Sequence, residues 1–130
     1  TGKVRFVYRE VFFDKFGLWA AMVARCGGEM KYFGIADMIY DTQKDWIGDG
    51  QEQAIADNLR KIGLKAGIAP DTLDACMKDN AMAKSLVATY QKNADADGIE
   101  STPSFLIDGQ KYSNMSYEEF STILDEKLGG

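Results

Sequence analysis

Helical spacing fills the centre of this chain, and β-type patterning is confined to its two ends. Residues 3–9 (KVRFVYR) largely alternate apolar and basic side chains, which predicts a strand. Near the other end, Ser104–Ile107 is a short β-type run. Asp108-Gly109 then forms a typical two-residue hairpin turn, and Gln110–Tyr112 is the returning strand. The predicted order is therefore one strand, a long helical block, a hairpin and a closing helix.

Apolar side chains that recur with a period near 3.6 residues predict five helices in the central block. Trp46–Gly50 interrupts this pattern and is expected to be a loop. Ser116, followed three residues later by Glu119, matches a capping box and predicts a final helix to about Leu128. The five central helices are expected at residues 17–26, 32–40, 52–66, the segment that follows Pro70, and 81–97.

The composition excludes several classes of function. The 130 residues carry 15 Lys and Arg against 20 Asp and Glu, a net charge of −5, so no nucleic-acid partner is expected. The absence of histidine excludes His-based acid–base catalysis, Ser-His and Cys-His pairs and His-containing zinc sites. Two cysteines cannot build a four-thiolate metal site, and we expect neither a metal nor a cofactor. No apolar stretch approaches the roughly 18 residues of a membrane span.

Cys26 and Cys76 lie among apolar neighbours on two predicted helices. Taken alone, these residues leave two interpretations open: buried free thiols that pack as small hydrophobic groups, or a disulfide that joins the helices. A catalytic thiol is disfavoured, because Cys26 lies at a helix C-terminus, where the helix dipole destabilises a thiolate.

Aromatic residues are frequent in the first third of the chain. Most are expected in the hydrophobic core, with a minority lining an exposed apolar groove as the alternative. The residues concerned are Phe12, Phe13, Trp19, Tyr32 and Phe33.

The C-terminal third resembles a known family. Residues 99–109 (IESTPSFLIDG), with the strand and helix that follow, resemble the cis-proline loop and C-terminal ββα unit of thioredoxin-fold proteins. The helical block, including residues 17–28, 31–40 and 84–97, is similar to that of DsbA-type thiol:disulfide oxidoreductases. Residues 3–9 match the second core strand of that family, so the resemblance covers nearly the whole chain.

This resemblance implies an α/β chain with an incomplete thioredoxin-like fold, which lacks the first core strand and the CxxC helix, and an inserted all-helical domain. Residues 1–13 and 98–130 would form the partial thioredoxin-like domain. Residues 14–97 would form the inserted domain, with 81–97 as a long connecting helix. Because the chain contains no CxxC, we expect it to be inactive alone and to be a fragment of a longer parent. Otherwise another chain fills the vacant sheet position by strand swapping or self-association.

The resemblance also implies site residues. Thr102 and Pro103, joined by a cis bond, would lie beside the sulfurs of the absent CxxC, and the backbone of Ser101 and Thr102 would pair with an extended substrate peptide. Relatives of this type can carry a second, structural cysteine pair in the helical domain. On that ground the resemblance favours a structural disulfide between Cys26 and Cys76.

The function implied is that of a fragment of a DsbA-like thiol:disulfide oxidoreductase that exchanges disulfides with secreted proteins. Its partners would be unfolded or reduced polypeptides and a membrane partner oxidase, and its location would be periplasmic or otherwise extracytoplasmic in a bacterium. A non-catalytic thioredoxin-like peptide-binding module is the alternative. A purely helical protein with an accidental hairpin is a third and weaker hypothesis.

Overall fold

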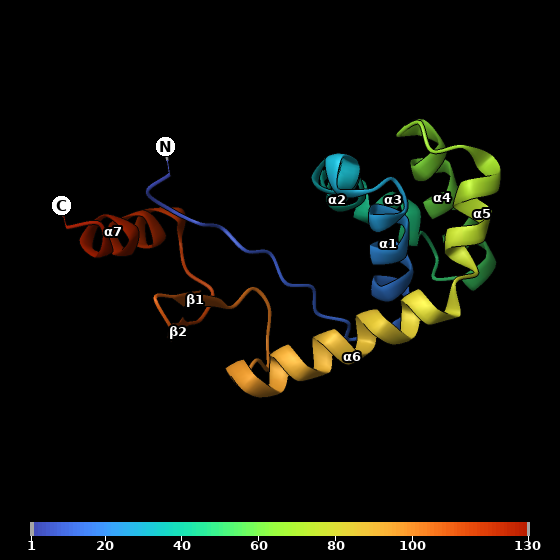
Figure 1. The fold of residues 1–130 in the computed structure, drawn as a ribbon. Coiled ribbons are helices and arrows are strands. Elements are labelled where there is room, and N and C mark those ends of the chain that lie inside the picture. The colour runs from blue at the N-terminus through green and yellow to red at the C-terminus, as the bar shows by residue number, and fades with distance from the viewer. Residues whose placement is uncertain (1, 130) are drawn as a thin grey trace. The chain divides into compact units, whose positions relative to one another are not determined.

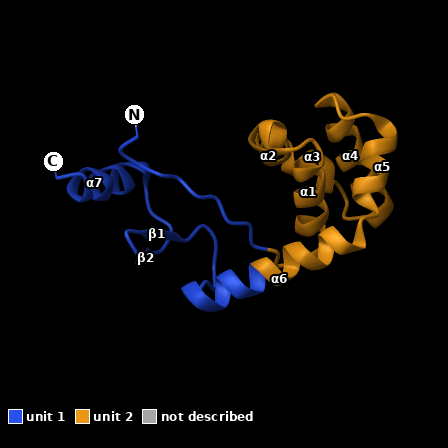
Figure 2. Ribbon diagram, viewed as in Figure 1, with its two compact units in different colours: residues 1–11, 90–130 blue, residues 12–89 orange. Residues whose placement is uncertain are grey.

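A computed structural model describes residues 2–129, which contain seven helices and one two-stranded hairpin (Figure 1). They form two compact units, Phe12–Thr89 and Thr1–Val11 with Tyr90–Gly130 (Figure 2). The expected boundary at residues 97 and 98 differs from this division, which falls within helix α6 (Asn80–Asp97). The helix is continuous across that point, so its first half belongs to one unit and its second half to the other.

The larger unit, here called the helical unit, has a core built from buried side chains of five helices. Ile55 and Leu59 lie four residues apart, one above the other on the same helix face, and both are fully buried. Ile35 and Ile39 repeat this spacing on a second helix. The helices of the unit are α1 (Lys15–Cys26), α2 (Glu29–Asp41), α3 (Gln43–Ile47), α4 (Glu52–Lys65) and α5 (Pro70–Met77), followed by the start of α6.

Trp46 shows where the expected loop was wrong. It lies on the single-turn helix α3, is buried, and donates its indole Nε1–H to the carbonyl oxygen of Ile39 at 2.8 Å. A helix of five residues is too short to show a repeating apolar stripe, so the sequence pattern could not reveal it.

The expectation of a buried position holds for some of the aromatic residues and is wrong for others. Trp19 and Tyr32 pack against the core, whereas Phe13 is 63% exposed and Phe33 is 56% exposed. Phe33 is two residues from buried Ile35, which places it about 200° around the helix and so on the outer face. Phe13 directly precedes Asp14, the N-cap of α1, and lies outside the helix.

A disulfide joins the last residue of α1, Cys26, to Cys76 near the end of α5. The two Cα atoms are 5.8 Å apart, and the sequence separation is 50 residues. The bond therefore connects two helices of one unit, in the pairing that the family resemblance implies.

The smaller unit, here called the hairpin unit, contains the expected hairpin and closing helix. Strand β1 (Phe105–Ile107) pairs antiparallel with β2 (Gln110–Tyr112). Asp108 and Gly109 connect them with φ angles of 50° and 81°, which explains the choice of Asp-Gly at this turn. Helix α7 (Tyr117–Lys127) begins with the expected capping box, in which Ser116 and Glu119 exchange hydrogen bonds of 3.1 and 3.2 Å.

Lys3–Arg9 was expected to be a strand, and this prediction was wrong. Residues 4–12 carry no helix or strand, and the described sheet consists of β1 and β2 alone. A strand requires a neighbour for its backbone hydrogen bonds, and the alternating pattern cannot supply one. Phe6 remains 70% exposed, and the guanidinium of Arg9 forms an exposed 2.9 Å ion pair with Asp97.

Among residues 2–129, no helix combines the length and the apolar content that crossing a membrane requires.

Loss of the disulfide should destabilise the helical unit. Because the bond closes a 50-residue loop, the chain-entropy model gives a loss of about 4 kcal/mol in the free energy of unfolding. Urea unfolding with and without dithiothreitol measures this loss. The double variant Cys26→Ser/Cys76→Ser serves as the control, since its stability should not respond to the reductant; an unchanged wild-type midpoint after reduction contradicts the prediction.

Gly63→Ala should destabilise the protein by about 1–3 kcal/mol through overpacking. A Cβ at this position would lie 2.8 Å from both methyl carbons of Leu73, which is fully buried and has no room to move aside. Gly34→Ala is the matched control. A Cβ there meets nothing within 4 Å, so this exposed helix substitution should stabilise by about 0.5–1 kcal/mol. Equal midpoints of the two variants in urea unfolding would contradict the packing argument.

Candidate active-site loop

The loop that carries the expected site residues begins where α6 ends. Gly98 adopts a φ of 63°, a left-handed conformation that favours glycine, and the amide of Ile99 donates to the carbonyl of Ala94 at 2.9 Å. The ammonium group of Lys111, on strand β2, donates to the carbonyl oxygen of Gly98. Hydrogen bonds from the helix end and from the hairpin therefore hold the start of this loop.

The Thr102–Pro103 peptide bond is cis. Ser101, Thr102 and Pro103 are all exposed, and the hydroxyl of Ser104 donates to the carbonyl oxygen of Ser101 at 2.6 Å, which closes the loop. Within residues 2–129, Thr102 makes no hydrogen bond to another residue, so its hydroxyl and its backbone groups are open to a ligand. The loop thus presents polar backbone at the surface directly before strand β1.

An aromatic contact supports the hairpin that follows the loop. The ring centroids of Phe105, on β1, and Phe120, on α7, are 5.0 Å apart with an interplanar angle of 37°. Both side chains are half-buried. Phe105 is the first residue of β1 and lies two positions after Pro103. The contact therefore packs the start of β1 against the closing helix.

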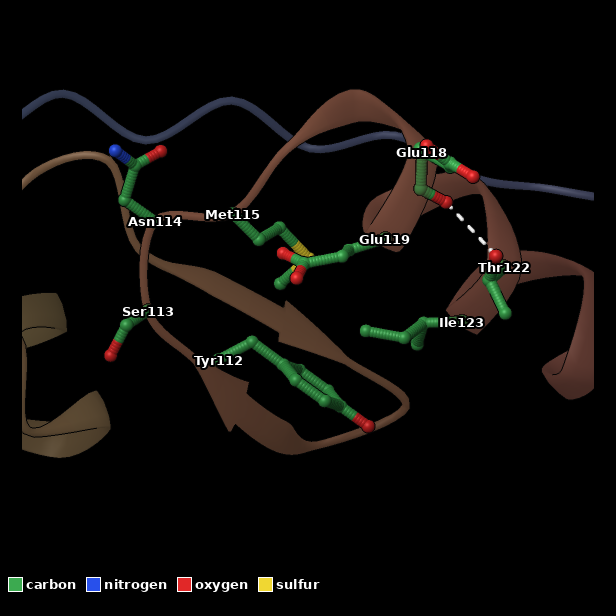
Figure 3. Close-up of a pocket in the computed structure, with 8 residues that line it drawn as sticks. All are labelled: Tyr112, Ser113, Asn114, Met115, Glu118, Glu119, Thr122 and Ile123. Carbon is green, nitrogen blue, oxygen red and sulfur yellow. Dashed lines mark hydrogen bonds between the residues drawn. The ribbon is translucent and has the colours of Figure 1, made fainter.

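The hairpin unit also has a shallow hollow of about 530 Å³, which the sequence did not indicate (Figure 3). Its two acidic residues form hydrogen bonds within helix α7 and its cap. Glu119 caps α7 through its side chain, and the hydroxyl of Thr122 donates to the carbonyl oxygen of Glu118 at 3.0 Å. No residue of the 101–103 loop lines the hollow, so it carries no part of the expected site. The lining residues are Tyr112, Ser113, Asn114, Met115, Glu118, Glu119, Thr122 and Ile123.

The two cysteines belong to a different unit from the loop. Cys26 and Cys76 lie in the helical unit and are joined to each other, so this chain keeps no free thiol. Thr102 and Pro103 lie in the hairpin unit. The sequence itself contains no CxxC that could act beside them. Residues 2–129 also contain no group of three or more side chains suited to hold a metal ion.

An ion pair between α4 and α5 of the helical unit shifts the pKa of both partners. The Arg60 guanidinium donates from Nε to Oδ1 of Asp74 at 2.6 Å and from Nη2 to Oδ2 at 3.1 Å. These hydrogen bonds hold the pKa of the Asp74 carboxyl below its usual value and raise the pKa of Arg60. Sequence reasoning did not single out this pair, because its members are 14 residues apart on different helices.

Comparison with known proteins identifies relatives of the chain. A family model described as thioredoxin matches residues 1–126. Proteins named "Putative protein-disulfide oxidoreductase" from Rickettsia felis and Rickettsia typhi are each 30% identical over 129 residues, which is 98% of this chain. The match covers 45% and 47% of those relatives, so the chain spans about half of their length. No solved structure matches the chain significantly.

The Arg60–Asp74 pair should make stability depend on pH. A carboxyl whose pKa is lowered on folding stabilises the folded state above its unfolded pKa of about 3.9, and this contribution is lost as the pH falls through the folded value. The stability difference between wild type and Asp74→Asn should therefore be largest at neutral pH and disappear in strong acid. Urea unfolding of both proteins over a pH series measures it. A difference that is constant with pH would contradict this assignment; Asp71→Asn, an exposed change on the same helix, is the control.

Proposed function

This chain belongs to the thioredoxin family, and we propose that it is the cis-proline part of a DsbA-like thiol:disulfide oxidoreductase whose CxxC lies outside residues 1–130. The observation that carries the proposal is the match of residues 1–126 to a thioredoxin family model, together with the exposed 101–103 loop directly before strand β1. The names of the Rickettsia relatives, and their roughly twofold greater length, also support it.

The reaction proposed for the whole protein is disulfide exchange through a mixed disulfide. A substrate thiolate attacks one sulfur of the CxxC disulfide, and the second CxxC sulfur leaves as a thiolate. A second substrate thiolate then attacks the substrate sulfur of the mixed disulfide. The substrate gains a disulfide, its two thiol protons pass to solvent, and the CxxC is reduced. No cofactor takes part in these steps.

This chain would supply the surface that holds the substrate beside the sulfurs. The backbone of Ser101 and Thr102, of which Thr102 makes no hydrogen bond within residues 2–129, would pair with an extended polypeptide, which needs no particular substrate sequence. Pro103 would pack beside the CxxC, and the hydroxyl of Thr102 would donate to a nearby thiolate and so tune its stability.

The exposed N-terminal segment is consistent with a sheet that further residues complete. Val4, Phe6 and Val7 are each more than half exposed, and their segment has the composition of a strand without the pairing of one. We propose that the first core strand and the CxxC helix of the incomplete fold come from the parent chain. A second copy of this chain, bound by strand exchange, is the alternative source. The helical unit would then be an insertion in the thioredoxin-like fold.

The proposed setting is extracytoplasmic, in the bacterial periplasm or an equivalent compartment. The Cys26–Cys76 disulfide fits an oxidising compartment, where such bonds persist. The proposed partners are unfolded or reduced polypeptides and a membrane oxidase that restores the CxxC disulfide.

A non-catalytic peptide-binding module is the second candidate function. The observation in its favour is that the chain has no CxxC and joins its only two cysteines to each other. Such a module would bind extended peptides through the same loop and would show no turnover.

The decisive measurement is the intact mass of the natural protein, with and without reduction and thiol alkylation. The oxidoreductase predicts a mass well above 14.4 kDa and one alkylatable cysteine pair in addition to Cys26 and Cys76. A mass of 14.4 kDa with a single pair would exclude the CxxC mechanism and leave the binding module.

Thr102→Arg tests the role of the loop in the whole protein. A long charged side chain at this exposed position should obstruct the substrate and lower kcat/KM for insulin reduction by about tenfold, equivalent to roughly 1.4 kcal/mol. Thr72→Arg, an exposed change in the helical unit, should leave the rate unchanged. Equal rates for the two variants count against the proposed site.

A further inference from the structure

A second hollow, of about 310 Å³, lies within the helical unit where α1, α4 and α5 meet. Neither the residues of the cis-proline loop nor the two disulfide cysteines line it. Apolar side chains from all three helices form its floor, and charged side chains from α4 and from the end of α5 surround it. Its lining residues are Trp19, Met22, Ala56, Asp57, Arg60, Asp74, Met77 and Lys78.

The floor of the hollow suits an aromatic ring. Trp19 is half-buried and supplies a large apolar surface, while Met22 is buried and Met77 half-buried. Methionine thioethers are flexible and polarisable, and they pack favourably against aromatic rings. The volume lies at the lower end of the range of about 300–1,000 Å³ that small-molecule sites occupy. A single ring with a short substituent therefore matches its size.

The charged groups around the floor have more unused donors than acceptors. Asp74 accepts hydrogen bonds on both carboxylate oxygens from Arg60, so these two charges neutralise each other. Asp57 accepts at Oδ1 from the side chain of Gln53 at 3.0 Å. The Lys78 ammonium makes no hydrogen bond or close ion pair with any described residue, although its charge adds to that of Arg60 in lowering the pKa of Asp74. Nη1 of Arg60 is likewise unused. The ammonium of Lys78 is thus the charge most available to a ligand.

We propose that this hollow binds a small aromatic carboxylate, with the ring on the Trp19 and methionine floor and the carboxylate on the Lys78 ammonium. The locked Arg60–Asp74 pair forms one wall and offers its remaining N–H groups to the same carboxylate. A cationic ligand would find one carboxylate oxygen, Oδ2 of Asp57, and would face Lys78. An aromatic acid and the C-terminal aromatic residue of a polypeptide share the chemistry that this site recognises.

The two tryptophans of the chain provide the readout. In a ¹H–¹⁵N correlation spectrum, the indole N–H of Trp19 reports on the hollow. The indole of Trp46 is buried and its N–H is hydrogen-bonded to the carbonyl oxygen of Ile39, so its signal serves as the internal reference. The Trp19→Phe variant assigns the two signals. The probes are 3-phenylpropanoate, its neutral amide and 3-phenylpropylamine, which share one ring and differ in charge.

The acid should shift the Trp19 signal and leave that of Trp46 in place, and it should bind more tightly than the amide and the amine. Lys78→Gln should weaken binding of the acid about two- to fivefold, the effect of one exposed ion pair, without changing binding of the amide. Lys61→Gln, an exposed change on α4 outside the hollow, should have no effect. Equal binding of acid and amine, or an unmoved Trp19 signal, would overturn the proposal.

A blocked dipeptide, N-acetyl-alanyl-phenylalanine, distinguishes the two possible ligands, a free aromatic acid and the C-terminal aromatic residue of a polypeptide. Tighter binding of the dipeptide than of 3-phenylpropanoate assigns the site to polypeptide C-termini, and the reverse order assigns it to a free acid. Both results support the recognition chemistry. Binding of the dipeptide amide as tightly as the dipeptide acid would contradict the role of Lys78.

Discussion

An extended segment becomes a β-strand only when a neighbouring strand accepts and donates its backbone hydrogen bonds. This requirement determines which segments of the hairpin unit form a sheet. Strands β1 and β2 satisfy it for each other, with Phe105 opposite Tyr112. Residues 4–12 have suitable side chains but, in the part of the chain that the structure describes, join neither strand, so they remain without regular structure and expose Phe6. The cis-proline loop directly precedes β1 of this two-stranded sheet. In the function proposed above, a further strand from the parent chain would extend the sheet beside this loop.

Local patterns in the sequence predicted much of the fold. Helical period, with Pro70 for α5, located α1, α2, α4, α5 and α6, and the capping box at Ser116 and the Asp-Gly turn located the closing elements. The two wrong predictions, for Trp46 and for residues 3–9, share a cause. In each case the local structure depends on contacts with residues outside the segment whose pattern was used. Trp46 is buried in the core with its indole N–H hydrogen-bonded to the Ile39 carbonyl oxygen, and residues 3–9 form no strand because the described sheet consists of β1 and β2 alone.

The candidate site was less accessible to reasoning from residues alone. Thr102 and Pro103 drew attention only through the family resemblance, since an isolated X-Pro pair is far more often trans. The two cysteines were equally compatible with free thiols until that resemblance was considered. Neither pattern nor resemblance indicated the hollow beside Arg60 and Asp74. Its residues come from three helices, and only the packing of those helices brings them together.

The Cys26–Cys76 bond also determines how the helical unit responds to cleavage of its backbone. The loop that it closes contains all of α2, α3 and α4. A protease that cuts once at the exposed Gly48–Gly50 turn, or anywhere else in this loop, therefore leaves two pieces that remain covalently joined. Each piece keeps one cysteine and part of the common core. The nicked chain would keep its intact mobility under non-reducing conditions and would separate into fragments only when the sulfurs are reduced.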